Sequence, residues 1–177
     1  MMANYKSLSI VPVDDIPKTV VDCPTTDLVD LYKLCSYMEE LCEKEKGIGL
    51  SAVQVGIPWK LFIVRYNSGS VFFHHYVNCE YIPLSEEKEK SLEGCLSLKK
   101  ADGQLRYFEV ERYTKIKVKG QMLKSDPKLE LIDFDKIVDP KNYYRVVYQH
   151  EIDHSGNGIF SPTLISDIGK EIKIWKN

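Results

Sequence analysis

The segment that most constrains this chain is the HExxH pattern that runs from His150 through Glu151 to His154. On a helix, residues four apart lie one turn apart on one face, so both imidazoles can reach a single metal ion with Glu151 beside it. The flanking residues give helix signals, with Asp139 as N-cap, Pro140 at the first position and Gly156-Asn157 as the stop. We predict a helix that presents this pattern, although two ordinary core or surface histidines stay an open alternative.

A catalytic site of this kind needs a third protein ligand and an open position for water. His74 and His75 are adjacent, so on a strand they point to opposite faces and at most one could face the site. Cys95 has a better setting in the segment EGCLS (93–97), where Gly94 allows a close backbone approach. A thiolate in such a turn is a natural metal ligand.

Length and composition exclude several classes of protein. A chain of 177 residues, 44% of them hydrophobic and 28% charged, fits one globular domain and excludes disorder as the main state. Its 24 basic and 26 acidic residues nearly cancel, so the chain lacks the positive electrostatic field that would bind a nucleic-acid backbone. No apolar run approaches the roughly 18 residues of a membrane span, and the first 30 residues lack a targeting pattern. We expect a cytoplasmic protein without nucleic-acid or membrane partners.

The N-terminal part predicts an arm followed by an amphipathic helix. Residues 1–24 contain three prolines, which favour an extended arm lying on the body. From Thr25 or Thr26 as N-cap, with Asp27 in the first turn, apolar residues recur at helical spacing until a stop at Gly47. The five cysteines form no regular framework, so we expect reduced thiols. Two of them, Cys35 and Cys42, lie on the apolar face of this helix and are predicted core residues.

The middle of the chain predicts a sheet. Two apolar segments, 61–66 and 71–78, flank a turn-like Asn67-Ser68-Gly69 and should pair antiparallel. The charged segment 85–90 is predicted to be a solvated loop. Further strands are predicted at 105–112, 115–119 and 129–134, the last two separated by a turn at 124–127.

A third segment, GIGLSAVQVG (47–56), contains three glycines and an isolated Gln54 among apolar residues. Alone it indicates only tight packing. Together with EGCLS (93–97) and QHEIDH (149–154), in this order, it resembles the three signature motifs of peptide deformylases. The resemblance covers about residues 25–160 and includes VNCE (77–80), where the family usually has Asn-Pro.

The resemblance implies a metal-dependent hydrolase that removes the N-formyl group from the initiator methionine of nascent chains and releases formate. It implies an α+β fold in which antiparallel or mixed sheets pack around a central metal-binding HExxH helix. One divalent metal ion is expected, Fe(II) in the cell, with Zn, Ni or Co as alternatives in a purified protein.

The family roles can be transferred by position. Cys95, His150 and His154 resemble the metal ligands and Glu151 the general acid and base. Gln54 and the backbone N–H of Leu96 match the oxyanion donors. The residues that would bind the methionyl substrate are Ile48, Gly49, Gly94, Tyr143, Val146 and Val147. Plain core packing of these residues is the alternative.

The chain departs from the family pattern at Ser51, where Ala is usual, at Cys79, where Pro is usual, and at Ser155, where Leu is usual. None of these changes removes a catalytic group. We expect a single domain over 1–177, with an arm (1–24), a motif-bearing core (25–160) and a short tail (161–177). Because 23 residues follow His154, too few for the long C-terminal helix of many bacterial members, ribosome association stays open.

Two other classes compete with a deformylase. One is a zincin-like endopeptidase that shares only HExxH, and the other is a structural or binding module with a catalytically silent metal site. Gln54 and Cys95 separate the three, because neither belongs to a generic peptidase motif and a structural site more often uses four protein ligands.

Overall fold

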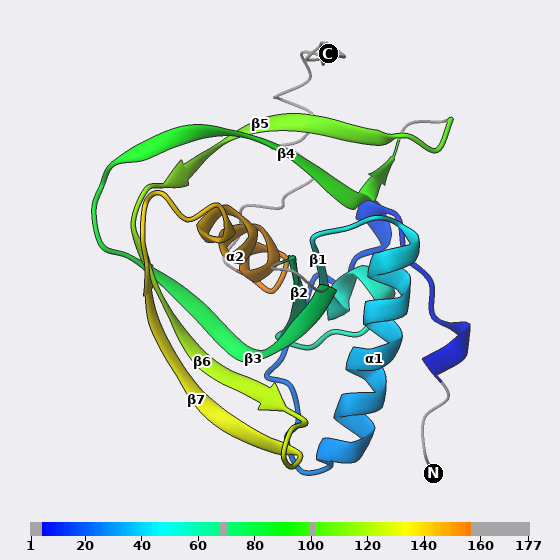
Figure 1. The fold of residues 1–177 in the computed structure, drawn as a ribbon. Helices are drawn as coiled ribbons and strands as arrows, with labels where there is room; N and C mark the ends of the chain where they lie inside the picture. The colour runs from blue at the N-terminus through cyan, green and yellow to red at the C-terminus, as the bar shows by residue number, and fades with distance from the viewer. Residues whose placement is uncertain (1–4, 68–70, 100–101, 157–177) are drawn as a thin grey trace.

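The computed structural model describes residues 5–67, 71–99 and 102–156. These residues form an α+β fold with two α-helices, α1 (Leu28–Lys44) and α2 (Tyr144–Asp153) (Figure 1). Three short 3-10 helices are η1 (Tyr5–Ser7), η2 (Val13–Asp15) and η3 (Ala52–Val55). The strands are β1 (Gly49–Ser51), β2 (Leu61–Asn67), β3 (Val71–Pro83), β4 (Lys88–Lys99), β5 (Leu105–Tyr113), β6 (Ile116–Lys124) and β7 (Glu130–Val138).

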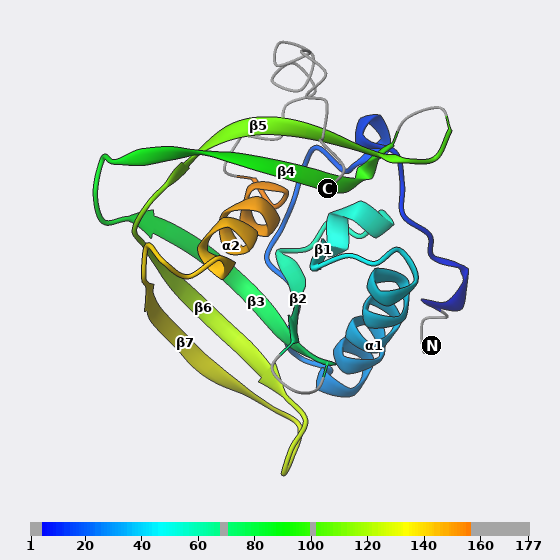
Figure 2. The same ribbon diagram turned by 45° about the horizontal axis from the view of Figure 1, so that its top comes forward.

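The strands form two sheets in which every neighbouring pair is antiparallel. One sheet has five strands in the order β1-β2-β3-β6-β7, and the other consists of β4 and β5. Figures 1 and 2 both place α2 in the space between the β4–β5 pair and the five-stranded sheet. The predicted α+β fold with antiparallel sheets is confirmed.

Helix α1 begins and ends differently from the prediction. Asp27 itself is the N-cap, because its carboxylate accepts a hydrogen bond of 2.9 Å from the Asp30 N–H. The helix ends at Lys44, and Lys46, with φ of 56°, is the left-handed residue rather than Gly47. Both differences lie within a few residues of the predicted ends, where competing cap residues decide the boundary.

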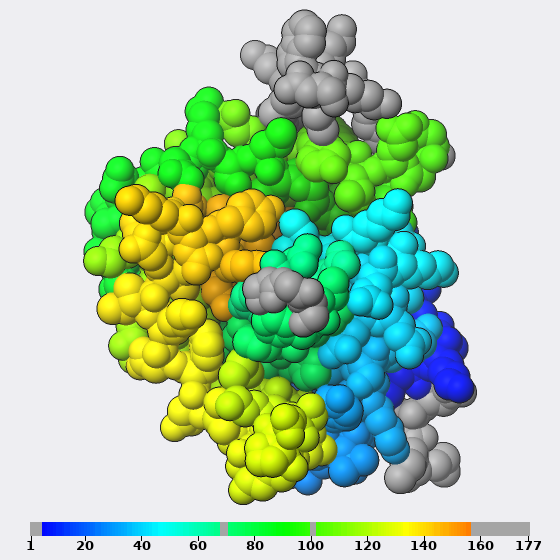
Figure 3. All heavy atoms as spheres, in the orientation of Figure 1, coloured from blue at the N-terminus to red at the C-terminus, as the bar shows by residue number. Residues whose placement is uncertain are grey.

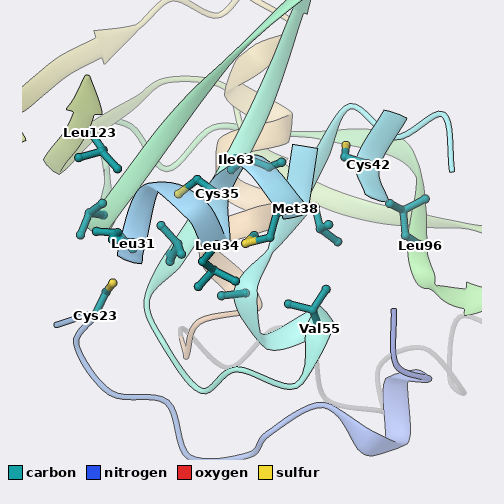
Figure 4. Close-up of a cluster of buried hydrophobic side chains, with 14 residues drawn as sticks. Cys23, Leu31, Leu34, Cys35, Met38, Cys42, Val55, Ile63, Leu96 and Leu123 are labelled. Atoms are coloured by element: carbon teal, nitrogen blue, oxygen red, sulfur yellow. The ribbon is translucent and has the colours of Figure 1, made fainter. Parts of the chain in front are cut away.

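The apolar face of α1 builds the first core. Figure 4 shows Leu34, Cys35, Met38 and Cys42 in one cluster with Ile63 of β2 and with Val55, and all four helix side chains are fully buried. The prediction that Cys35 and Cys42 are core residues is confirmed. Burial of one such side chain stabilises the fold by about 1.5–3 kcal/mol.

The hairpin of β2 and β3 is confirmed as antiparallel, with Arg65 opposite Phe73. Part of its predicted turn, residues 68–70, lies outside the described residues. The solvated loop predicted at 85–90 is wrong in its second half, because β4 already begins at Lys88. Here Lys88 lies over the Tyr113 ring, 4.6 Å from its centroid, and Glu89 forms an ion pair with Arg145 of α2. These contacts come from distant segments, so local charge alone mispredicted the strand.

Helix α2 begins at Tyr144, later than the predicted start at Asp139. The Asp139 carboxylate accepts from Lys141 N–H at 2.8 Å, and its carbonyl accepts from Asn142 N–H at 2.9 Å. Aspartate thereby stabilises a turn in place of the first helical turn. Asn142 then accepts from Tyr144 N–H at 3.0 Å and satisfies the start of the helix.

The N-terminal segment reaches the centre of the molecule. Val11 N–H donates to the carbonyl of Gln54 at 2.8 Å, and Val21 forms an isolated parallel bridge with Trp59. Asn78 accepts from Cys23 N–H at 2.7 Å, which fastens the end of this segment to β3. The predicted tail, 161–177, lies outside the described residues.

Candidate active site

Three candidate ligand side chains meet between β4 and α2. The ligand atoms of Cys95, His150 and His154 all lie within 4.8 Å of one another, and all three residues are buried. The Cys95 Sγ is 3.4 Å from the His154 Nε2. Cys95 lies on strand β4 rather than in the predicted turn, next to an irregularity in the pairing with β5 after Gly94. The close approach expected at Gly94 is present, because Gly94 pairs with Tyr107 and an added Cβ would lie 3.2 Å from the Tyr107 ring.

Glu93 orients the first histidine of the pair. Its Oε2 lies 2.8 Å from the His150 Nδ1, and both of its oxygens accept from Arg112 at 2.7 Å. Arg112 also forms an ion pair with Asp153, and all of these groups are buried. Because Nδ1 donates to Glu93, Nε2 is the ring nitrogen with which His150 can bind a metal ion.

This network fixes charges around the cluster. Burial opposes ionisation of Glu93, but the hydrogen bonds from Arg112 and His150 outweigh it and lower the pKa of Glu93 to about 2. Burial likewise opposes a charged His150, yet its hydrogen bonds to Cys95 and Glu93 raise its pKa to about 10. Burial and two nearby cations hold the pKa of His154 well below its usual range, so this imidazole is in the neutral form that binds metals.

Glu151 follows His150 on α2 and is also buried. The Ser51 Oγ lies 2.8 Å from its Oε2 and 2.8 Å from its backbone carbonyl oxygen. Burial raises the pKa of Glu151 to about 7, against the opposing effects of His150 and Ser51. A carboxyl group with this pKa can both accept and release a proton near neutral pH.

Gln54 lies on η3 and its amide faces the cluster. Its Nε2 is 3.4 Å from the Cys95 Sγ and 3.3 Å from the Ser97 Oγ. Its Oε1 accepts from Ser51 N–H at 2.9 Å, which fixes the direction of the amide. Leu96 follows Cys95 on β4, and its side chain packs near Cys42 in the first core (Figure 4).

A cavity of about 190 Å³ opens beside these groups. Gln54, Leu96, His150 and Glu151 line it on the side of the cluster. All six residues predicted for substrate binding also line it: Ile48, Gly49, Gly94, Tyr143, Val146 and Val147. The structure brings these residues together, and their role in binding stays a prediction.

Sequence reasoning missed several groups of the site. Leu92 and Tyr107 line the cavity and are 49% and 40% exposed, which places apolar surface at its rim. Tyr107 lies there because it is the cross-strand partner of Gly94, a relationship that no local spacing reveals. Arg112 carried no motif signal either. Two features of the sequence indicate this pair: Arg112 is a basic residue in an apolar strand pattern, and Glu93 is an acidic residue two positions before Cys95.

The remaining two histidines stay outside the cluster. His75 is paired with Glu39 of α1, and the His74 ring lies 4.8 Å from the ring of Tyr66, centroid to centroid. Both are strand residues of β3, as predicted.

Comparison with known proteins identifies the family. A model of the polypeptide deformylase family matches residues 10–168. The chain belongs to the polypeptide deformylase family. Among its relatives, the peptide deformylase of Brachyspira hyodysenteriae is 35% identical over 135 residues, which cover 73% of this chain and 65% of the relative. That of Carboxydothermus hydrogenoformans is 31% identical over 158 residues, covering 89% of this chain and 91% of the relative.

Solved deformylase structures share the fold. A probable peptide deformylase from synechococcus phage S-SSM7 has a TM-score of 0.66 and 31% identity, with 84% of this chain and 94% of that chain covered. A class I type b peptide deformylase from Acinetobacter baumannii has a TM-score of 0.65 and 25% identity, with 84% and 92% covered. The deformylase family is metal-dependent, and Cys95, His150 and His154 form a possible metal site in this member.

Residues at the start of α2, beside the site of this deformylase-family chain, reach the molecular surface. In the space-filling view, yellow and orange residues around the start of α2 reach the surface between green strands and the cyan part of the chain (Figure 3). Tyr143 is 60% exposed there. None of the helices in the described part of the chain is long and apolar enough to cross a membrane.

Proposed function

We propose that this chain is a metal-dependent hydrolase that removes the N-formyl group from the initiator formyl-methionine of nascent polypeptides and releases formate. One observation carries the proposal: the ligand atoms of Cys95, His150 and His154 lie within 4.8 Å of one another, next to the cavity that Gln54 and Glu151 line. Family membership supports the same reaction.

In this proposal α2 is a central metal-binding helix, and one divalent ion is held by Cys95, His150 and His154. Three protein ligands leave a position for water, as catalytic sites require. A thiolate with two imidazoles suits iron, zinc, nickel or cobalt, and we expect Fe(II) in the cell. When bound, the metal supplies a Lewis acid that lowers the pKa of water from about 15.7 toward roughly 7.

Glu151 moves the proton. Its carboxylate takes the proton from the attacking water and later gives it to the amine that leaves, so that it acts as base and then as acid. A pKa of about 7 fits both tasks near neutral pH.

The N-terminal segment supports the other side of the site, since Val11 donates to the Gln54 carbonyl. We therefore include the arm (1–24) with the core (25–160) in a single domain, and we propose that the tail (161–177), which lies outside the described residues, belongs to it as well.

Gln54 and Leu96 stabilise the charge that develops on the formyl oxygen. The Gln54 Nε2 and the backbone N–H of Leu96 are the proposed donors, and each donor of this kind contributes roughly 3 kcal/mol to the transition state. The Gln54 amide is already oriented by its bond to Ser51 N–H, so little reorganisation accompanies the reaction.

The cavity binds the methionyl side chain. Val146 and Val147 form an apolar wall one turn before His150, and Ile48 and Tyr143 lie at its exposed edge. Gly49 and Gly94 keep the walls open for a peptide backbone. The partners are N-formyl-methionyl peptides in the cytoplasm, with the ribosome as an open addition, and we propose neither nucleic acid nor membrane as a partner.

The deciding assay compares formate release from formyl-Met-Ala-Ser with cleavage of the unformylated peptide by the metal-loaded protein. We expect formate release without internal cleavage, and we expect Glu151→Gln to lose most turnover while it keeps the metal. Cleavage of the unformylated peptide would favour a zincin-like endopeptidase. Bound metal with neither reaction would favour a catalytically silent module.

A further inference from the structure

Ser51 stands where the deformylase pattern usually has Ala, and it is fully buried at the end of β1. Its hydroxyl oxygen lies 2.8 Å from the Glu151 Oε2, a residue 100 positions away in the sequence. The same oxygen is 2.8 Å from the backbone carbonyl oxygen of Glu151. The extra hydroxyl therefore contacts the residue that moves the proton in the proposed reaction.

Gly49 contacts the same carboxyl group from another point of β1. Residues two apart on a strand face the same side, so Gly49 and Ser51 both face α2. A Cβ added at Gly49 would lie 2.8 Å from the carboxyl carbon of Glu151, and the nearest atom is its Oε1. Gly49 also lines the cavity. Strand β1 thus has one residue against each carboxyl oxygen.

We infer that Ser51 is a positioning residue whose hydroxyl holds the Oε2 of Glu151, so that Oε1, over Gly49 at the cavity wall, takes the proton from the attacking water and gives it to the leaving amine. The Ser51 hydroxyl has one proton, and in this inference it is donated to Oε2 rather than to the Glu151 carbonyl oxygen. The last torsion of a glutamate side chain is broad, so this hydrogen bond selects one orientation of its two oxygens. Without the hydroxyl, Oε2 is left buried without this donor and the carboxyl group can rotate. This inference rests on the proposed function.

Ser51→Ala removes the hydroxyl, and with it the capping-box contact that the Ser51 side chain makes with the Gln54 backbone, while the Ser51 N–H that orients the Gln54 amide stays in place. We expect kcat for formyl-Met-Ala-Ser to fall about tenfold to a hundredfold, the range that corresponds to one hydrogen bond to a charged group. KM and metal content should not change, because the carboxylate acts in the chemical step and not in binding. Ser155→Ala is the matched control: its hydroxyl is also buried, makes no hydrogen bond with a described residue and should leave kcat unchanged.

A double-mutant cycle separates positioning from a structural effect. In the Glu151→Gln background the carboxylate is absent, so Ser51→Ala should change the residual kcat less than about twofold. An equal loss of kcat in both backgrounds would overturn the inference, because the serine would then act through another group. Unchanged kcat in Ser51→Ala, with an active parent, would overturn it as well and leave the proposed function intact.

A second variant covers the case in which Ser51→Ala does not fold. Ser51→Cys keeps the buried volume nearly filled but replaces the hydroxyl by a weak donor. With metal content and melting temperature at the parent's values, its kcat should fall as in the alanine variant. Parent-like kcat in Ser51→Cys would overturn the inference. An inactive, metal-loaded parent would overturn the proposed function itself, and this inference with it.

Discussion

The Nδ1 of His150 donates to the Oε2 of Glu93 over 2.8 Å, and the same carboxylate is held by two hydrogen bonds from Arg112. The ring is thereby fixed in one orientation, with Nδ1 as the donor to Glu93, before any metal binds. Glu93 of β4 and Arg112 of β5 therefore orient a single ligand atom, the Nε2 of His150 on α2.

Glu93→Gln should weaken metal binding about tenfold to a hundredfold, because a neutral amide orients the imidazole less well and makes it a poorer ligand. Competition with a metal-binding dye measures the affinity. The matched control is Glu109→Gln on β5, which removes an exposed ion pair with Lys90 and should not change the affinity. Equal affinities for the parent and Glu93→Gln would mean that Glu93 has no part in holding the ligand.

Arg112→Met should lower the free energy of unfolding by about 3–5 kcal/mol, because it leaves the carboxylates of Glu93 and Asp153 buried without their shared cation. Urea unfolding at neutral pH measures the change. Lys117→Met is the control, since its ion pair with Asp135 is partly exposed, with the two side chains 29% and 54% accessible, and should contribute less than about 1 kcal/mol. A loss as small as that of the control would show that the network is not needed for stability.

The chemistry of the site was largely predictable from the sequence, since HExxH places two imidazoles on one helical face and EGCLS supplies a thiolate. Five strands, β2, β3, β5, β6 and β7, were predicted where apolar segments alternate with turns, whereas β1 and β4 were not. The first part of β4 and the start of α2 were mispredicted for two different physical reasons. Glu89 is held by Arg145 of another element, and Asp139 closes a turn in place of a helix. Arg112 and Ser51 were missed as parts of the site because their partners lie 19 and 100 residues away.

Cys95→Ser should lose metal, because a neutral hydroxyl is a much poorer ligand than a thiolate. Metal analysis after gel filtration, together with the rate of formate release, measures both consequences. Cys79→Ser is the control: this thiol is also buried, but it contacts the backbone carbonyls of Val77 and Gln121 rather than the ligand cluster. If Cys95→Ser binds metal and deformylates like the parent, the third ligand is another residue.

Gln54→Leu should lower kcat by about 10²–10³ with a smaller effect on KM, since the amide hydrogen bond strengthens as charge develops on the formyl oxygen. Steady-state kinetics with formyl-Met-Ala-Ser separates the two constants. Ile57→Leu, a partly buried apolar substitution just after η3, is the control for local packing and should leave both constants near the parent's values. A kcat unchanged by Gln54→Leu would remove the amide from the reaction.

Iron-loaded protein should lose activity to peroxide much faster than nickel-loaded protein. A ferrous ion bound by the Cys95 thiolate combines two groups that oxidise readily, whereas nickel has little tendency to undergo the same redox step. Both forms are prepared from one chelated batch and treated with the same peroxide concentration, and residual formate release is followed with time. Reloading inactivated iron protein with fresh Fe(II) then separates two causes. Recovery would place the damage at the metal, whereas permanent loss together with a mass increase on the peptide containing Cys95 would place it at the thiolate. Equal rates of inactivation in the two forms would contradict the assignment of a redox-sensitive iron site.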